Sequence, residues 1–259
     1  MADAKTFVVN APAWIDLSTK DPAAARDYYS KLFGWQAQPE RDPEAGGYAI
    51  ARLGGQDVAG IGGQQDPNAP SAWMIYIGTR DADETSKKIE AAGGKIVAPA
   101  FDVMDVGRMA VFQDPSGAFI ALWQPKTMNG FGVQRKSGAY SWAELNSRGL
   151  DKARPFYKKV FGWGEKVNAN AMGEGNDYIE FKQGDESIAG AMEMNPMVPK
   201  EVPSYWMLYF GVRDVDKEHQ KATQLGGTEM VPPTDFPGGR FSILSDPQGA
   251  MFGLMSSDQ

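Results

Sequence analysis

The sequence contains no cysteine and only one histidine among its 259 residues. The lack of cysteine excludes disulfide bonds, thiolate metal sites, iron–sulfur clusters and cysteine nucleophiles. The single histidine, His219, lies in the charged stretch DKEHQK, so we expect a solvated side chain rather than a metal ligand. Without a usable histidine or cysteine, no conventional nucleophilic triad can be assembled.

Positive charge and long apolar runs are also scarce. The net charge of −7 and the isoelectric point near 4.9, with no basic run, argue against nucleic-acid binding. No stretch approaches the roughly 18 apolar residues of a membrane span, and MADAKTFVVNAPAW at the N-terminus does not resemble a secretion signal. We therefore expect a cytoplasmic protein with no membrane or nucleic-acid partner, whose ligand is a neutral or cationic small molecule.

The chain does contain a long internal repeat. WIDLSTKDPAAARDYYSKLFGW starts at Trp14 and WAELNSRGLDKARPFYKKVFGW starts at Trp142, and the two agree without a gap at nine positions, including the closing FGW. The pairs GR, DP and GA recur from Gly107 and Gly239. Such self-similarity indicates a tandem duplication. We predict a first module over residues 1–125, a linker over 126–140 and a second module over 141–259.

Each copy alternates between strand and helix patterns. Asp21 is a good helix N-cap, and apolar residues then recur at helical spacing as far as Phe33. Alternating stretches such as AWIDLST and GRMAVFQ predict strands. Pro155 lies inside the equivalent helix of the second copy, so we expect that helix to start late or to kink. The predicted order is βαβββ, used twice in each copy.

Paired βαβββ units with FGW after the first helix and DPxG before the last strand resemble the vicinal oxygen chelate superfamily. That superfamily includes glyoxalase I, extradiol dioxygenases, fosfomycin-resistance enzymes and bleomycin-resistance proteins. The resemblance covers nearly the whole chain and implies an α+β fold: a tandem duplication of the paired module, with four βαβββ units whose incomplete barrels form cups. It does not imply one function, because the scaffold carries lyases, dioxygenases, transferases and drug-binding proteins.

Enzymes of this superfamily chelate a divalent metal with side chains from strands that line the cup. The resemblance places the first-strand ligand at Trp14 and Trp142, and the fifth-strand ligand on or next to Trp73 and Trp206. The remaining ligand positions fall near Gly60 and Gly190, and on Ala121 and Gly253. Tryptophan, glycine and alanine side chains do not bind a divalent ion. We therefore expect neither a metal nor another cofactor.

Equivalent residues of the two copies supply the candidate site. Either Trp14, Trp73, Trp142 and Trp206 form aromatic walls for a flat or cationic ligand, or they only fill the barrels. Asp16 and Glu144 lie two residues beyond Trp14 and Trp142, hence on the same strand face, where a carboxylate serves as general base or counter-ion. The alternative is a solvated face or an acid that holds a loop. Arg108 and Arg240 either anchor an anionic group or pair with Asp102 and Asp235.

Three functions are consistent with these features. The first is a metal-independent protein of the drug-resistance or secondary-metabolite type that binds a small aromatic or cationic molecule. The second is a glyoxalase-like lyase or isomerase for a small carbonyl compound or metabolite, with Glu144 or Asp16 as base; whether turnover occurs stays open. In the third, one copy only scaffolds the other, although both retain the same Trp, acid and Arg. Because the duplication supplies an internal pseudo-twofold, we expect a monomer, with a homodimer as the alternative.

Overall fold

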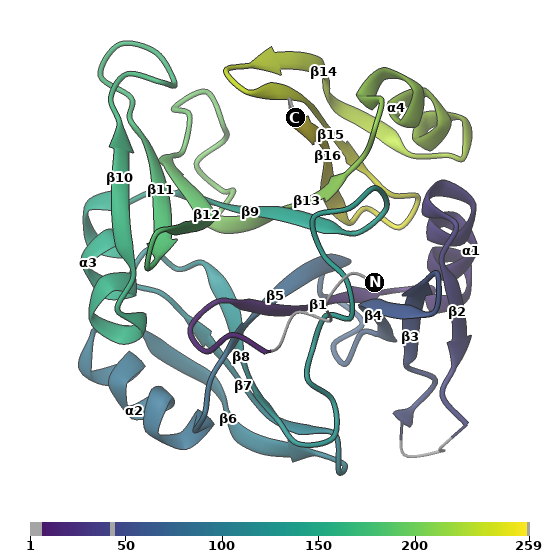
Figure 1. The fold of residues 1–259 in the computed structure, drawn as a ribbon, viewed down its shortest axis with the longest axis horizontal. Coiled ribbons are helices and arrows are strands. Elements are labelled where there is room, and N and C mark those ends of the chain that lie inside the picture. The colour runs from purple at the N-terminus through teal and green to yellow at the C-terminus, as the bar shows by residue number, and fades with distance from the viewer. Residues whose placement is uncertain (1–6, 42–44, 258–259) are drawn as a thin grey trace.

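The computed structural model describes residues 7–41 and 45–257 and contains the four expected βαβββ units. Two eight-stranded sheets each belong to one copy (Figure 1). The elements are β1 (Pro12–Thr19), α1 (Pro22–Phe33), β2 (Gln36–Pro39), β3 (Ala49–Leu53), β4 (Gln56–Gly63), β5 (Ala72–Gly78), α2 (Ala82–Ala91), β6 (Lys95–Val103), β7 (Gly107–Gln113), β8 (Phe119–Pro125), β9 (Tyr140–Ser147), α3 (Leu150–Phe161), β10 (Gly164–Asn168), β11 (Tyr178–Gln183), β12 (Glu186–Glu193), β13 (Tyr205–Gly211), α4 (Val215–Gln224), β14 (Thr228–Phe236), β15 (Gly239–Ser245) and β16 (Met251–Ser257).

Both sheets have the same topology. Their strand orders are β2-β3-β4-β1-β5-β8-β7-β6 and β10-β11-β12-β9-β13-β16-β15-β14. The central pair in each sheet is antiparallel, and each central strand is flanked by a parallel neighbour. The central strands of the two sheets lie back to back, and the outer strands bend away from this junction (Figure 1). We call the face of each sheet that is turned away from the junction its cup; the two cups face in opposite directions (Figure 1).

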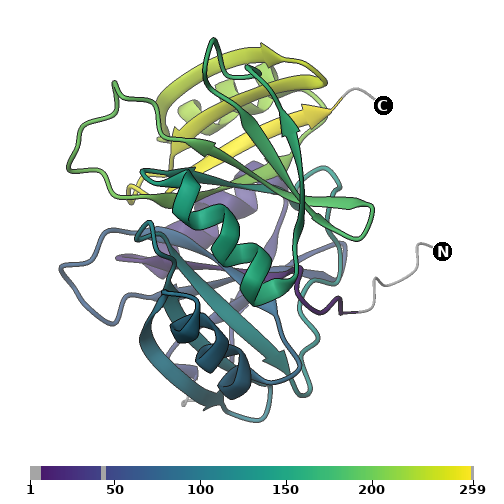
Figure 2. The ribbon, with the colours of Figure 1, turned by 90° about the vertical axis from the view of Figure 1, so that its left-hand side faces the viewer.

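The first helix of each module packs against the other module. Figures 1 and 2 show α1 beside α4, and α3 beside α2. The ring of Phe33 on α1 lies 5.0 Å from that of Phe210 on β13, and Phe156 on α3 lies 6.1 Å from Phe112 on β7. Buried residues of both modules form one continuous hydrophobic cluster. The repeated helix sequence therefore builds the junction between the two copies.

Local signals explain how these two helices begin and end. The Asp21 side chain accepts hydrogen bonds from the backbone N–H groups of Ala23 and Ala24, as the N-cap prediction requires. The glycine of each FGW sequence ends its helix in the left-handed region, with φ of 76° at Gly34 and 71° at Gly162. Helix α3 starts at the position equivalent to the start of α1 and continues through Pro155, so it does not start late; a kink at Pro155 stays a prediction.

Two edge strands were not predicted. Strands β2 and β10 lie at the outer edges of their sheets and are mostly exposed. Their sequences, QAQP and GEKVN, lack the alternation of apolar and polar residues that marks a half-buried strand. They complete the βαβββ order of the first unit in each module.

The segment between the sheets is held to both modules. The N–H of Phe131 donates to the Ala13 carbonyl at 2.9 Å, and the N–H of Gly138 donates to the Gly211 carbonyl at 2.8 Å. A Cβ at Gly130, which has a φ of 96°, would overlap the Ala13 carbonyl, so this close approach needs glycine. The predicted linker thus follows the module surfaces, and its last residue, Tyr140, belongs to β9. The module limits at 125 and 141 stay a prediction.

Candidate functional site

The first cup contains a carboxylate held by three donors. Trp14 and Asp16 share one face of β1, and Tyr76 on β5 lies opposite Trp14. Asp16 Oδ1 accepts from Trp14 Nε1 at 2.8 Å and from the Tyr48 hydroxyl at 2.7 Å. Asp16 Oδ2 accepts from the Tyr76 hydroxyl at 2.8 Å. Both carboxylate oxygens are therefore occupied by protein donors.

Glycine makes room for this network. Gly60 on β4 pairs with Asp16 across the sheet, and a Cβ there would overlap the Tyr48 hydroxyl and the Asp16 carboxylate. Gly190 plays the same part in the second cup, where a Cβ would overlap the Tyr178 hydroxyl. Both positions are glycine because a tyrosine hydroxyl occupies the space that a larger side chain would fill.

The second cup repeats the arrangement with looser contacts. Trp142 Nε1 donates to the Tyr178 hydroxyl at 2.9 Å. The Tyr209 hydroxyl reaches Glu144 Oε1 at 3.3 Å, and Asn146 Nδ2 lies 3.5 Å from the same oxygen. The Tyr178 hydroxyl lies close enough to Glu144 to lower its pKa. Trp142 is half-buried, whereas Trp14 is 2% exposed, so the second indole is the more accessible one.

The two carboxyl groups respond alike to burial. Desolvation raises the pKa of Asp16, and the hydrogen bonds from Tyr48, Tyr76 and Trp14 oppose that rise. Desolvation also raises the pKa of Glu144, against hydrogen bonds from Tyr178 and Tyr209. A raised pKa makes a carboxylate a stronger base and increases its attraction for a proton or a cation. Of the two, Glu144 has the longer contacts with its donors and is freer to exchange them for a ligand.

The residues at the superfamily's metal positions do not fit a divalent ion. Gly253 on β16 pairs with Tyr209, and a Cβ there would overlap the tyrosine ring, so a longer ligating side chain has no room. The carboxylates Asp16 and Glu144 are already hydrogen-bonded to tyrosines. Glu180, which pairs with Gly190 and so shares the face of Glu144, is bound to Lys166, Asn168 and Ser187. Among residues 7–41 and 45–257, no three His, Asp or Glu side chains come together as a metal site would require.

Trp73 and Trp206 lie on the opposite face of the sheets from Trp14 and Trp142. Trp73 pairs with Leu17, and Trp206 with Leu145, and both leucines belong to the buried cluster between the modules. The expectation that all four indoles line the cups is therefore corrected for these two. Their neighbours Met74 and Met207 face the cups instead, since they pair with Asp16 and Glu144.

Trp73 and Trp206 take part in hydrogen-bonded chains that cross the junction. Trp206 Nε1 donates to the Tyr157 hydroxyl at 3.0 Å, and that hydroxyl donates to Asp114 of the first module at 2.8 Å. The related chain runs from Trp73 through Tyr29 to Asp246, with both distances 3.1 Å. Both aspartates come from the DP turns that mark the repeat. These tryptophans therefore stabilise the junction.

Arg108 and Arg240 are bound to aspartates. Arg108 Nε and Nη2 donate to Asp83 on α2 at 2.9 and 3.0 Å, and Nη1 donates to Asp102 at 3.1 Å. Arg240 makes the equivalent pairs with Asp216 and Asp235. The paired alternative of the sequence interpretation is the arrangement found. Each arginine ties a helix to an outer β-hairpin, and a ligand anion would have to displace an aspartate.

His219 is buried rather than solvated. It is 7% exposed, and its Nε2 lies 2.8 Å from Glu229 Oε2. The expectation of a solvated side chain is wrong because α4 turns this position toward β14, so that its charged sequence neighbours do not reveal its environment. The ring lies on the helix side of the sheet and belongs to neither cup.

Sequence reasoning missed the four tyrosines of the cups. Tyr48 and Tyr178 stand at the start of YAIARL and YIEFKQ, and Tyr76 and Tyr209 follow the β5 and β13 tryptophans at the same spacing. Their recurrence at matching places in both copies is the signal that could have identified them. Because a phenol is compatible with both core and site, only the side-chain contacts show that its hydroxyl reaches a carboxylate.

Comparisons with known proteins agree with this architecture. A family model for the Glyoxalase/Bleomycin resistance protein/Dioxygenase superfamily matches residues 11–122 and 139–254. The CFP32 protein of Mycobacterium tuberculosis, which has a provisional glyoxylase name, is 39% identical over 250 residues, covering 94% of each chain. The anthracycline biosynthesis protein DnrV of Streptomyces peucetius is 36% identical over 263 residues, covering 96% of this chain and 94% of the relative.

Solved structures show the same fold at low identity. The Mn(II)-bound glyoxalase from Novosphingobium aromaticivorans superposes with a TM-score of 0.64 at 15% identity, over 96% of this chain and 82% of that one. The 2,3-dioxygenase LapB from Pseudomonas sp. KL28 gives a TM-score of 0.67 at 13% identity, over 99% and 94%. None of the helices in the described part of this chain has the length and hydrophobicity of a membrane span.

Proposed function

Because the chain belongs to the glyoxalase/bleomycin resistance protein/dioxygenase superfamily, whose scaffold fixes no single reaction, we propose that it binds a small aromatic or cationic molecule in the second cup without a metal. Trp142 and Tyr178 form the aromatic wall, and Glu144 is the counter-ion. The names of its relatives, for anthracycline biosynthesis and glyoxylase activity, support a small-molecule ligand.

The observation that carries this proposal is the difference between the two cup carboxylates. Asp16 receives three hydrogen bonds of 2.7–2.8 Å from Trp14, Tyr48 and Tyr76, so it has little capacity left for a ligand. Glu144 has contacts of 3.3 and 3.5 Å beside a half-buried indole. An anionic oxygen next to an aromatic face suits a cation that also stacks. The second cup is therefore the proposed ligand site, and in the first cup the carboxylate is saturated by its own donors.

The second candidate function is a metal-free lyase or isomerase acting on a small carbonyl compound or metabolite. The raised pKa of Glu144 and Asp16 favours this candidate, because a desolvated carboxylate is a better general base. Glu144 would take a proton from a carbon next to the substrate carbonyl, and the Tyr178 and Tyr209 hydroxyls would hold the base in position. A screen of small molecules by thermal shift and tryptophan fluorescence, followed by turnover assays on each hit, tests both candidates.

Glu144→Gln separates binding from catalysis. The amide keeps the shape of the side chain, so an enzyme with Glu144 as base will keep substrate affinity and lose turnover. A protein that uses Glu144 as a counter-ion will instead lose affinity for cations. Because burial raises the Glu144 pKa, cation affinity of the native protein should fall as pH drops through that raised value, and the glutamine variant should show no such dependence. Titrations at several pH values measure this.

The matched control is Asp16→Asn in the first cup, which should leave ligand affinity unchanged.

The same substitution at Glu144 also has an expected effect on stability. Since the folded state takes up the Glu144 proton more readily than the unfolded state, the ionised group destabilises the fold above its raised pKa. Glu144→Gln should therefore not lower stability at neutral pH. If neither affinity nor turnover responds to Glu144→Gln in a folded protein, the assignment of Glu144 is wrong.

The purified protein should contain no stoichiometric divalent metal. The reason is that Trp142, Gly190 and Gly253 occupy the positions where relatives of this fold chelate one, and tyrosines fill the adjacent space. Elemental analysis after purification without chelators checks this. Close to one zinc, nickel or iron per module, removable by a chelator with loss of stability, would contradict the proposal and favour a metal-dependent enzyme.

A further inference from the structure

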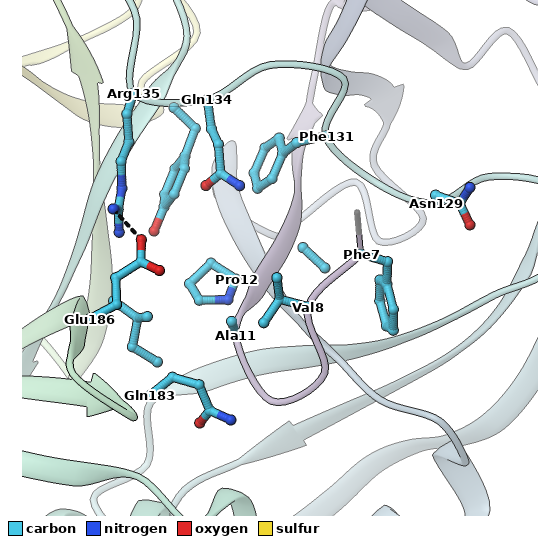
Figure 3. A pocket seen from close by; sticks show the side chains of 13 residues that line it. Phe7, Val8, Ala11, Pro12, Asn129, Phe131, Gln134, Arg135, Gln183 and Glu186 are labelled. Carbon is cyan, nitrogen blue, oxygen red and sulfur yellow. Dashed lines mark hydrogen bonds and ion pairs between the residues drawn. The ribbon is translucent and has the colours of Figure 1, made fainter. Parts of the chain in front are cut away.

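We propose that the junction between the modules contains a second small-molecule site, separate from both cups, for a neutral monocyclic aromatic molecule that carries one hydroxyl group. The site is a cavity of about 140 Å³ between the N-terminal segment, the inter-module segment and strands β11 and β12, and we call it the junction cavity (Figure 3). Its apolar walls include Phe7, Val8, Pro12, Phe131 and Ile188.

The size and lining of the junction cavity suit one aromatic ring. Its volume is close to the roughly 150 Å³ that holds a molecule the size of benzene. Phe7 and Phe131 contribute ring surfaces, and Val8 and Pro12 lie between them and Gln183 (Figure 3). The rest of the lining is polar: Asn129, Gln134, Gln183 and Tyr140 are uncharged, and Arg135 and Glu186 form an ion pair with each other.

Tyr140 contributes a buried hydroxyl with no partner of its own. It lines the junction cavity and is 2% exposed, and its hydroxyl has no hydrogen-bond partner among the described residues. The Tyr140 ring stacks on Phe131 with centroids 5.0 Å apart and an interplanar angle of 13°. A buried hydroxyl without a partner is costly, so a ligand oxygen that displaces the side chains covering this hydroxyl would supply a missing interaction. Burial holds the Tyr140 pKa above its ordinary value, which keeps the hydroxyl protonated and able to donate.

Arg135 closes one side of the junction cavity and favours a neutral ligand. Its backbone is in the left-handed region, with φ of 57°, which is uncommon for a residue other than glycine or asparagine. Its N–H donates to the Tyr140 carbonyl at 2.6 Å. The guanidinium pairs with Glu186, toward which it points in Figure 3, and donates to the Ser187 carbonyl at 2.9 Å. Because this charge is already matched across the junction, an anionic ligand gains little from it.

Fluorine NMR with para-fluorophenol and fluorobenzene tests the site on the full chain. We expect saturable binding of both probes, with para-fluorophenol bound about tenfold more tightly, the effect of one good buried hydrogen bond. Tyr140→Phe should remove this preference without lowering the melting temperature, because the deleted hydroxyl has no partner among the described groups. Val8→Trp should block the junction cavity and abolish the bound signal.

Val97→Trp is the matched control for Val8→Trp. The two valines are 47% and 48% exposed, so neither change should prevent folding, and Val97 lies on β6 away from the junction cavity. The proposal is overturned if no saturable signal appears, if Val8→Trp leaves the signal intact, or if Tyr140→Phe retains the preference for the phenol. A signal lost in Trp142→Ala but retained in Val8→Trp belongs to the second cup, which overturns the junction site and leaves the proposed function standing.

Discussion

Replacing Trp206 with alanine should lower the free energy of unfolding by about 3–5 kcal/mol, the usual cost of deleting a buried indole. Trp206 is 7% exposed, its ring makes an edge contact with Tyr157 at 5.6 Å, and its N–H supports the Tyr157–Asp114 hydrogen bond across the junction. Ligand affinity of the second cup should change little, because Trp206 faces away from it. Urea unfolding monitored by circular dichroism measures the first effect.

Tyr157→Phe is the conservative comparison for this prediction. It keeps the ring and removes only the hydroxyl that links Trp206 to Asp114, so its cost should be smaller, about 1–3 kcal/mol for buried groups left without a partner. If Trp206→Ala weakened ligand binding strongly while leaving stability unchanged, the placement of Trp206 in the junction would be contradicted.

Trp142→Ala should weaken an aromatic ligand of the second cup by about 1–3 kcal/mol, the scale of losing a large apolar contact. Trp142 is half-buried, so the same change should cost less stability than Trp206→Ala. Its N–H donates to the Tyr178 hydroxyl, which lies next to Glu144, so the cup loses part of its geometry as well as its wall. Isothermal titration with the strongest hit of the ligand screen measures the loss.

The internal control is Trp14→Ala in the first cup. Trp14 is 2% exposed and contacts Phe131 at 5.6 Å, so its loss should reduce stability but not the affinity of the second cup. Equal losses of affinity in both variants would show that the two cups bind ligand alike. Unchanged affinity in Trp142→Ala would show that Trp142 does not contact the ligand and has only a structural role.

The sequence predicted the repeat, the fold class and the placement of each cup carboxylate on the same strand face as its indole. That placement follows from alternation along one strand, which relates Trp14 to Asp16 and Trp142 to Glu144. Alternation does not relate one strand to the next, because the pairing register decides which residues share a face. Trp73 was therefore placed in the cup with Trp14, although β5 turns Met74 and Tyr76 toward it.

Other features depend on contacts between distant parts of the chain. The burial of His219 follows from the packing of α4 against β14, and the hydroxyls of Tyr48 and Tyr178 reach carboxylates only because Gly60 and Gly190 leave space. Periodicity within a segment carries no information on such contacts. The packing of α1 and α3 against the other module as well as their own is of the same kind, since a helix pattern shows an apolar face but not what covers it.

Helices α1 and α3, which contact both modules, constrain how the two halves of the chain can change. A substitution at Tyr29 or Phe33 alters the surface on which the second module rests, and one at Phe156 or Tyr157 alters the first. The inner faces of the duplicated halves must therefore evolve together. The cups face outward on separate sheets, so a substitution in one cup does not alter the other module. One cup can therefore change to bind a new ligand while the other stays as it is. The shorter hydrogen bonds to Asp16 and the longer contacts of Glu144 are the kind of difference that independent change of the two cups would produce.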